Sequence, residues 1–142
     1  AVTVAHYVAE ERQLYTVLIF APEDFEMARA VANTVQSQRC LVFPQAGSAP
    51  LIHIAALIEK AVCVITPDTS IVHLASAVKT PVLAFFSPLL SNREWLPFRV
   101  LHEALMAKQG EPVSSIPASR LIDGIEVFLA KLKISHQMEI HQ

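Results

Sequence analysis

The chain has 142 residues, which is enough for one domain with its own hydrophobic core. With 53% hydrophobic and only 17% charged residues, its composition excludes a disordered chain and favours strands that are buried on both faces. The formal net charge of -2 gives no general positive field, so bulk electrostatics do not predict nucleic-acid binding.

Neither a membrane span nor a metal site is predicted. No apolar run reaches the length of a membrane span, and none has the layout of a signal peptide. Cys40 and Cys63 lie in or beside apolar strand runs, as expected for reduced, buried thiols in a cytosolic protein rather than a disulfide or metal pair. The six histidines show no ligand spacing, so we expect neither a metal nor a cofactor.

Helical and strand patterns alternate along the chain. Apolar, β-branched runs predict strands at residues 15–20, 40–43, 62–65 and 82–86, with a short edge strand at residues 100–101. Amphipathic segments predict helices at residues 2–12, 22–37, 51–60 and 70–78. A last helix has Pro117 in its first turn and ends near Lys133. This alternation predicts an α/β fold with an open parallel sheet covered by helices on both faces.

One domain is expected over residues 1–134, followed by a tail, residues 135–142, that has no clear assignment. The chain begins without Met and without a strand before its first helical pattern. From this start we expect a piece of a longer protein.

The stretch 61–88 predicts a strand–helix–strand unit with a polar turn between its first strand and its helix. Ligands of open parallel sheets bind beyond the carboxyl ends of the strands, where helix N-termini point. Asp68 or Thr69 can cap this helix and leave the N–H groups of Ser70, Ile71 and Val72 facing outward, able to hold a phosphate or diphosphate. An ordinary capped helix without a ligand is the alternative that the spacing alone favours.

Glycine-based phosphate motifs are excluded. The chain has only three glycines, Gly47, Gly110 and Gly124, so neither G-x-G-x-x-G nor a P-loop is possible. A nucleotide site in this chain must therefore hold phosphate by another arrangement.

His73 falls off the apolar face of the same helix. At about 100° per residue, Ile71, Leu74, Ala75 and Val78 share one face, and His73 lies on the far side. There it could donate to a phosphate or sugar oxygen. A solvent-exposed or loop-packed histidine is the alternative.

Two other predicted strand ends would share this edge. Glu23 and Asp24 follow the first strand, where an acid can bind ribose hydroxyls, although acids in a helix's first turn also serve the helix dipole. Gln45 and Ala46 follow the second strand, where backbone could meet a base. Trp95 and Pro97 lie in the loop after the strand at 82–86, where packing is favoured over a substrate wall.

The central motif carries a family resemblance. Residues 65–77, ITPDTSIVHLASA, followed by residues 81–88, PVLAFFSP, resemble the signature of the ADP-heptose:lipopolysaccharide heptosyltransferases, glycosyltransferase family 9. Three further stretches fit that family's layout and extend the likeness over most of the chain: residues 20–24, 57–61 and 95–97.

The resemblance implies the C-terminal, Rossmann-like domain of a two-domain GT-B glycosyltransferase. It implies that a nucleotide-diphosphate sugar such as ADP-heptose binds with its diphosphate at residues 68–72, with His73 at phosphate or sugar and Glu23 or Asp24 at ribose. The implied reaction is an inverting sugar transfer to a lipopolysaccharide core or related lipid-linked glycan, in the cytoplasm or at the inner membrane. The general base would belong to the N-terminal domain, so no catalytic residue is expected in this chain, which alone would bind donor weakly and transfer nothing.

Ser70 departs from the family pattern, because many members carry Gly at this position. Backbone approach to the diphosphate would be less close, or a hydroxyl would supplement it. Two alternatives stay open: a non-catalytic Rossmann-like binding module, and a GT-B-like sugar-nucleotide epimerase.

Overall fold

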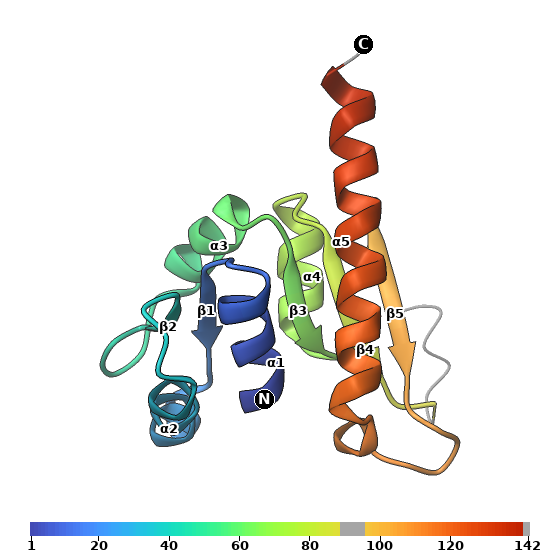
Figure 1. Cartoon of the computed structure of the whole chain (residues 1–142). Coiled ribbons are helices and arrows are strands. Elements are labelled where there is room, and N and C mark those ends of the chain that lie inside the picture. The colour runs from blue at the N-terminus through green and yellow to red at the C-terminus, as the bar shows by residue number, and fades with distance from the viewer. Residues whose placement is uncertain (89–95, 141–142) are drawn as a thin grey trace. The chain divides into compact units, whose positions relative to one another are not determined.

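The computed structural model describes residues 1–88 and 96–140, with the side chains of the last helix described as far as Lys133. The chain forms two compact units, Ala1–Ile54 and Ala55–Gln142. Each unit has its own parallel sheet (Figure 1). The predicted loop at Trp95 lies outside the described residues, whereas Pro97 is buried, as the packing alternative expects.

The first unit is a parallel pair of strands with helices before and between them. α1 (Val2–His6) continues as a π-helical turn, η1 (Tyr7–Glu11), and β1 (Thr16–Ile19) follows. A 3-10 turn, η2 (Pro22–Asp24), leads into α2 (Phe25–Val35), and β2 (Cys40–Phe43) returns parallel to β1. α3 (Leu51–Lys60) comes next and contains the division between the units.

The core of the first unit is made of small residues on α1, η1 and α2 that pack on one face of the strand pair. Ala5, Ala9, Val35 and Cys40 are buried there, and Leu18 packs against them. Small side chains allow the helix backbones to lie close together, because little volume separates them.

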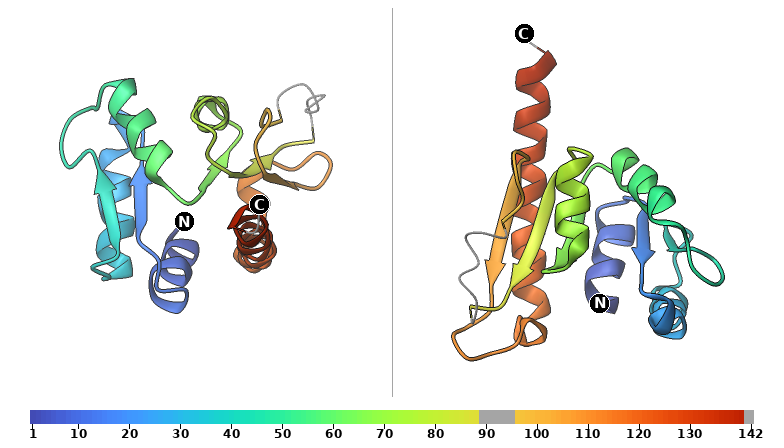
Figure 2. Two further views of the ribbon diagram at one scale, coloured as in Figure 1. Left: turned by 90° about the horizontal axis from the view of Figure 1, so that it is seen from above. Right: turned by 180° about the vertical axis from the view of Figure 1, so that it is seen from behind.

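The second unit has three parallel strands in the order β3–β4–β5. They are β3 (Val64–Pro67), β4 (Val82–Phe86) and β5 (His102–Met106), with α4 (Ser70–Ala77) between the first two. After β5 come a 3-10 turn, η4 (Val113–Ser115), and α5 (Ala118–Ile140). Figure 2 shows α4 and α5 on opposite faces of this sheet, as predicted.

The middle strand forms the core of this unit. In β4, Val82, Leu83, Ala84 and Phe86 are fully buried, because helices cover both faces of the sheet. On α5, Ile125 and Phe128 are buried to the same degree.

The C-terminal end of α4 is fixed by hydrogen bonds. Lys79 has a φ of 64°, and the Thr80 amide donates to the Ala75 carbonyl over 2.9 Å, which closes the helix in a left-handed turn. The Thr80 hydroxyl, in a side chain that is only 3% exposed, donates to the Ile58 carbonyl near the end of α3 over 2.8 Å. The end of α4 is therefore tied to the end of α3 within the second unit.

Three predicted boundaries are corrected. The strand expected at residues 62–65 is β3, which begins two residues later, at Val64. Val62 is 69% exposed, and the backbone hydrogen bonds to the neighbouring strand run from Val64 to Asp68. The edge strand expected at residues 100–101 is β5, which begins at His102. The last helix begins after Pro117, at Ala118, and continues past Lys133 to Ile140. Within the described residues, no helix has the length and hydrophobicity needed to cross a membrane.

Candidate functional site

The turn between β3 and α4 lies at the carboxyl edge of the second unit's sheet. Asp68 and Thr69 connect the two elements, and both are exposed. The Asp68 amide donates to the Phe85 carbonyl over 2.9 Å, so the chain stays on the sheet ladder until α4 begins. Together with the exposed Ser70, this gives a polar surface at the sheet edge where ligands of parallel sheets bind.

Thr69 is the cap of α4. Its backbone is extended (φ -142°, ψ 173°), and its side-chain hydroxyl accepts a hydrogen bond from the Ile71 amide. The N···O distance is 3.4 Å, which is long for such a bond. Of the two predicted candidates, Asp68 and Thr69, the structure therefore selects Thr69.

The amides at this helix end are not equivalent, contrary to the expectation that three of them face outward unbonded. The Val72 amide donates to the Thr69 carbonyl over 3.0 Å, so this donor is occupied. The Ile71 amide is held only by its long bond to the Thr69 hydroxyl. Ser70 contributes the first amide of α4, together with an exposed hydroxyl. An incoming anion would thus meet Ser70 and Ile71 rather than Val72.

Beneath the turn lies Thr66, the buried third residue of β3. Its side chain is 6% exposed, and its hydroxyl donates to the Pro67 carbonyl over 3.0 Å. The same hydroxyl lies 3.2 Å from the Thr69 hydroxyl. The sequence alone does not single out Thr66, because a threonine in a strand is ordinary and only the fold brings it under the cap.

The prediction that His73 lies off the core of α4 is confirmed. His73 is exposed, as is Ser70 one turn earlier, whereas Val72 and Ala75 are fully buried. Ile71 and Leu74 are half-buried, so the buried face is centred nearer Val72 than the periodicity predicted. α4 packs on both β3 and β4, which explains the broader apolar face.

In the first unit, the other predicted site residues also share one sheet edge. β1 and β2 are parallel with Ile19 opposite Phe43, so the segments after them leave the same edge. Glu23 and Asp24 follow β1, and Gln45 and Ala46 follow β2; all four are exposed. The segments that carry these residues therefore start from the same edge of the first unit's sheet.

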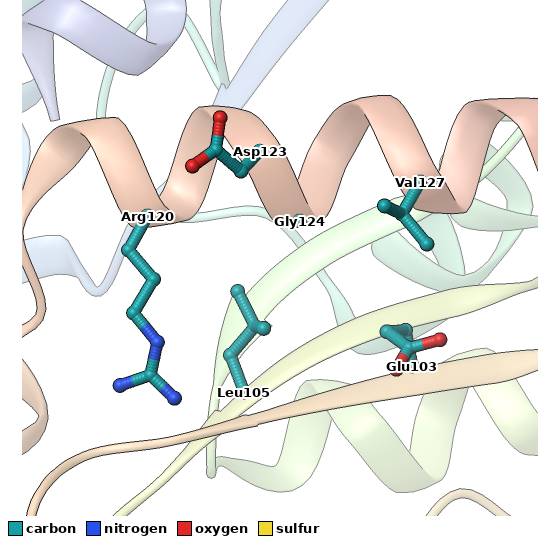
Figure 3. A pocket seen from close by; sticks show the side chains of 6 residues that line it. All are labelled: Glu103, Leu105, Arg120, Asp123, Gly124 and Val127. Carbon is teal, nitrogen blue, oxygen red and sulfur yellow. The ribbon is translucent and has the colours of Figure 1, made fainter.

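A shallow hollow between β5 and α5 was not predicted (Figure 3). It is lined from β5 by Glu103 and Leu105 and from α5 by Arg120, Asp123, Gly124 and Val127. A Cβ atom added at Gly124 would lie 2.6 Å from a Leu105 methyl carbon, so this glycine allows the helix to approach the strand closely. A glycine inside a helical pattern was the available signal for that contact. We assign no ligand to this hollow.

Metal ligation and thiol chemistry receive no support from the described residues. No group of three or more His, Cys, Asp or Glu residues among them is placed to hold a metal ion. Burial raises the pKa of the Cys63 thiol to about 11 and also raises that of Cys40. Both thiols are thus protonated and poorly nucleophilic at neutral pH.

A family model described as glycosyltransferase family 9 (heptosyltransferase) matches residues 4–112. The chain belongs to glycosyltransferase family 9. The family 9 resemblance of the sequence is therefore confirmed. A search of curated protein sequences finds no match.

Two solved structures share the fold of this family 9 chain. A glycosyl transferase family 9 protein from Veillonella parvula superposes with a TM-score of 0.76 at 20% identity, over 92% of this chain and 40% of that one. The ADP-heptose lps heptosyltransferase II of E. coli gives a TM-score of 0.71 at 18% identity, over 93% of this chain and 41% of that one. The predicted α/β fold is confirmed, and the chain spans about two fifths of the length of each of these proteins.

Proposed function

We propose that this chain is the donor-binding half of an inverting glycosyltransferase that takes a heptose-like sugar from a nucleotide diphosphate. The single observation that carries the proposal is the exposed, weakly capped N-terminus of α4 at the carboxyl edge of a parallel sheet. Such a helix end presents amide donors and a partial positive charge, which suit a diphosphate.

The chemistry of each side chain suggests its role. The Ser70 amide and hydroxyl and the Ile71 amide are donors for diphosphate oxygens. His73 is exposed one turn further along α4 and would donate to a phosphate or sugar oxygen. Asp68 is a carboxylate, which accepts hydrogen bonds, so it suits a sugar hydroxyl better than a phosphate.

For the nucleoside of the donor, the proposal assigns residues that follow β1 and β2. Glu23 or Asp24 would accept hydrogen bonds from ribose hydroxyls, and backbone at Gln45 and Ala46 would meet the base. The acceptor in this proposal is a lipopolysaccharide core or related lipid-linked glycan, on the cytoplasmic side of the inner membrane. Its hydroxyl would be activated by a general base in an N-terminal GT-B domain, so this chain alone would bind donor without transferring sugar.

A titration with ADP and UDP, followed by backbone amide NMR shifts, tests the donor site. We expect the amides of Ser70 and Ile71 to shift with saturation. If neither nucleotide moves any amide from Ser70 to Val72, the diphosphate site is wrong, and a non-catalytic binding module becomes the better account.

His73→Ala should weaken ADP binding by about fivefold, the loss of one hydrogen bond to a charged group. His53→Ala is the matched control, because His53 is an exposed helical histidine on α3. Equal affinity for the His73→Ala variant and the wild-type chain would reject the role of His73.

A further inference from the structure

Three hydrogen-bond contacts link the polar groups beneath the α4 N-terminus. The Thr66 hydroxyl lies 3.0 Å from the Pro67 carbonyl, to which it can donate. It also lies 3.2 Å from the Thr69 hydroxyl, and either oxygen can be the donor of this contact. The Thr69 oxygen in turn accepts from the Ile71 amide. The Thr69 hydroxyl is therefore shared between the strand beneath it and the helix that it caps.

The geometry also explains why the cap is long. Thr66 is 94% buried in β3, so its oxygen is held in place by the sheet. Its bond to Thr69 orients the Thr69 hydroxyl toward the strand, and the Ile71 amide is left 3.4 Å away. Amide–oxygen hydrogen bonds usually measure about 2.9–3.0 Å, so this amide is only weakly satisfied.

We infer that Thr66 is a positioning residue, which holds the Thr69 cap back and keeps the Ile71 amide available for a diphosphate oxygen. The inference rests on the proposed function, since it concerns the same donor site. A phosphate oxygen is charged and accepts a stronger hydrogen bond than a hydroxyl does, so the anion displaces a long cap readily. In the free protein, Thr69 caps the helix. When the ligand binds, the Ile71 amide exchanges its bond to the Thr69 hydroxyl for a bond to a phosphate oxygen.

Removing the Thr66 hydroxyl lets Thr69 cap Ile71 at full strength. Thr66→Val keeps the shape of the side chain, and we expect it to weaken inorganic pyrophosphate binding by about fivefold, the factor of a typical cap hydrogen bond. Thr66→Ser keeps the hydroxyl and should bind as the wild-type chain does. Thr69→Val removes the competing cap and should bind pyrophosphate at least as tightly as wild type.

The double variant separates positioning from a general structural role. In the Thr69→Val background, Thr66→Val should have no further effect, because there is no cap left to release. An equal loss in both backgrounds would overturn the inference, and so would a Thr66→Val variant with wild-type affinity. Wild-type Ser70 and Ile71 amides that do not respond to ADP would instead reject the donor site itself.

Hydrogen exchange gives a second test that needs no substitution. In the free chain the Ile71 amide should exchange faster than the Val72 amide, whose bond to the Thr69 carbonyl measures 3.0 Å. Pyrophosphate should slow the exchange of Ile71 most. Slower exchange at Ile71 than at Val72 in the free chain would contradict a weak cap.

Discussion

Two turns of this molecule have the same position in a strand–helix unit and opposite chemistry. The turn after β1 begins with Pro22 and carries Glu23 and Asp24, and within the described residues no side chain caps the helix that follows. The turn after β3 is capped by the Thr69 hydroxyl, and its acid, Asp68, lies before the cap. The first turn places acids at the positive end of the helix dipole, whereas the first turn of α4 contains no acid.

The difference separates two kinds of ligand contact. Carboxylates at a helix start repel phosphate but accept hydrogen bonds from hydroxyls, as ribose would offer. Hydroxyls and amides at a helix start donate to phosphate. Exchanging the chemistry of the two turns is therefore the most direct way to test the proposed donor site.

The largest effect is expected from Ser70→Asp, which gives the α4 turn the acidic character of the α2 turn. A carboxylate beside a bound diphosphate should lower ADP affinity by at least about tenfold, because like charges then meet at close range. Helix stability should not fall, since an acid suits a first turn. Calorimetric titration measures the affinity, and Ser70→Asn is the uncharged control. Equal loss with Asn and Asp would mean that charge is not the cause.

The reverse change removes the charges of the α2 turn. Glu23→Gln with Asp24→Asn should weaken ADP binding by about fivefold, the loss of one charge-assisted hydrogen bond to ribose. The loss should disappear with 2′,3′-dideoxy-ADP, which lacks both ribose hydroxyls. Glu26→Gln, an exposed change one turn along α2, is the control. A loss that persists with the dideoxy nucleotide would place these acids elsewhere than at ribose.

The free energy of unfolding should depend more on Thr69 at the start of α4 than on Asp24 at the start of α2. Thr69→Val removes a side-chain cap and should lower the free energy of unfolding by about 1 kcal/mol. Asp24→Ala removes a residue at the start of α2 whose side chain makes no cap hydrogen bond, so it should cost about 0.5 kcal/mol or less. Urea unfolding followed by circular dichroism measures both, and a larger cost for Asp24→Ala would reverse the comparison.

The effect that is absent at neutral pH concerns the thiols, one in each unit. Because burial raises the pKa of Cys63 from 9.0 to about 11, the folded state favours the neutral thiol. The stability that this thiol contributes is complete below about pH 9 and declines as the pH rises toward 11. Cys63→Ser should reduce the decline of the unfolding free energy with pH in that range. An unchanged slope would assign the pH dependence to other groups.

Local patterns were sufficient for much of the fold. β2, α3 and β4 begin and end at the predicted residues, because each is an apolar segment bounded by turn residues on both sides. The bounds of β5 were predicted wrongly, since its half-buried sequence begins with His102 and Glu103 and lacks a strand pattern. Its position is set by pairing with β4, which the sequence of β5 does not show.

The candidate site, like the fold, could be predicted from the sequence only in part. The exposure of Ser70 and His73 and the cap at Thr69 follow from helix periodicity and capping chemistry, and these features could be predicted. The role of Thr66 could not, because it depends on the contact between the Thr66 and Thr69 hydroxyls. Only the folded turn brings these two hydroxyls to 3.2 Å from each other.

The hydrogen bonds at the far end of α4 have a consequence for the thermodynamics of binding. Thr80 joins that end to the Ile58 carbonyl, while Thr69 and Thr66 hold the near end against β3. The helix therefore loses its conformational entropy when the protein folds rather than when a ligand arrives. A diphosphate at Ser70 and Ile71 would meet a preorganised frame, and less of the interaction energy would be lost to ordering.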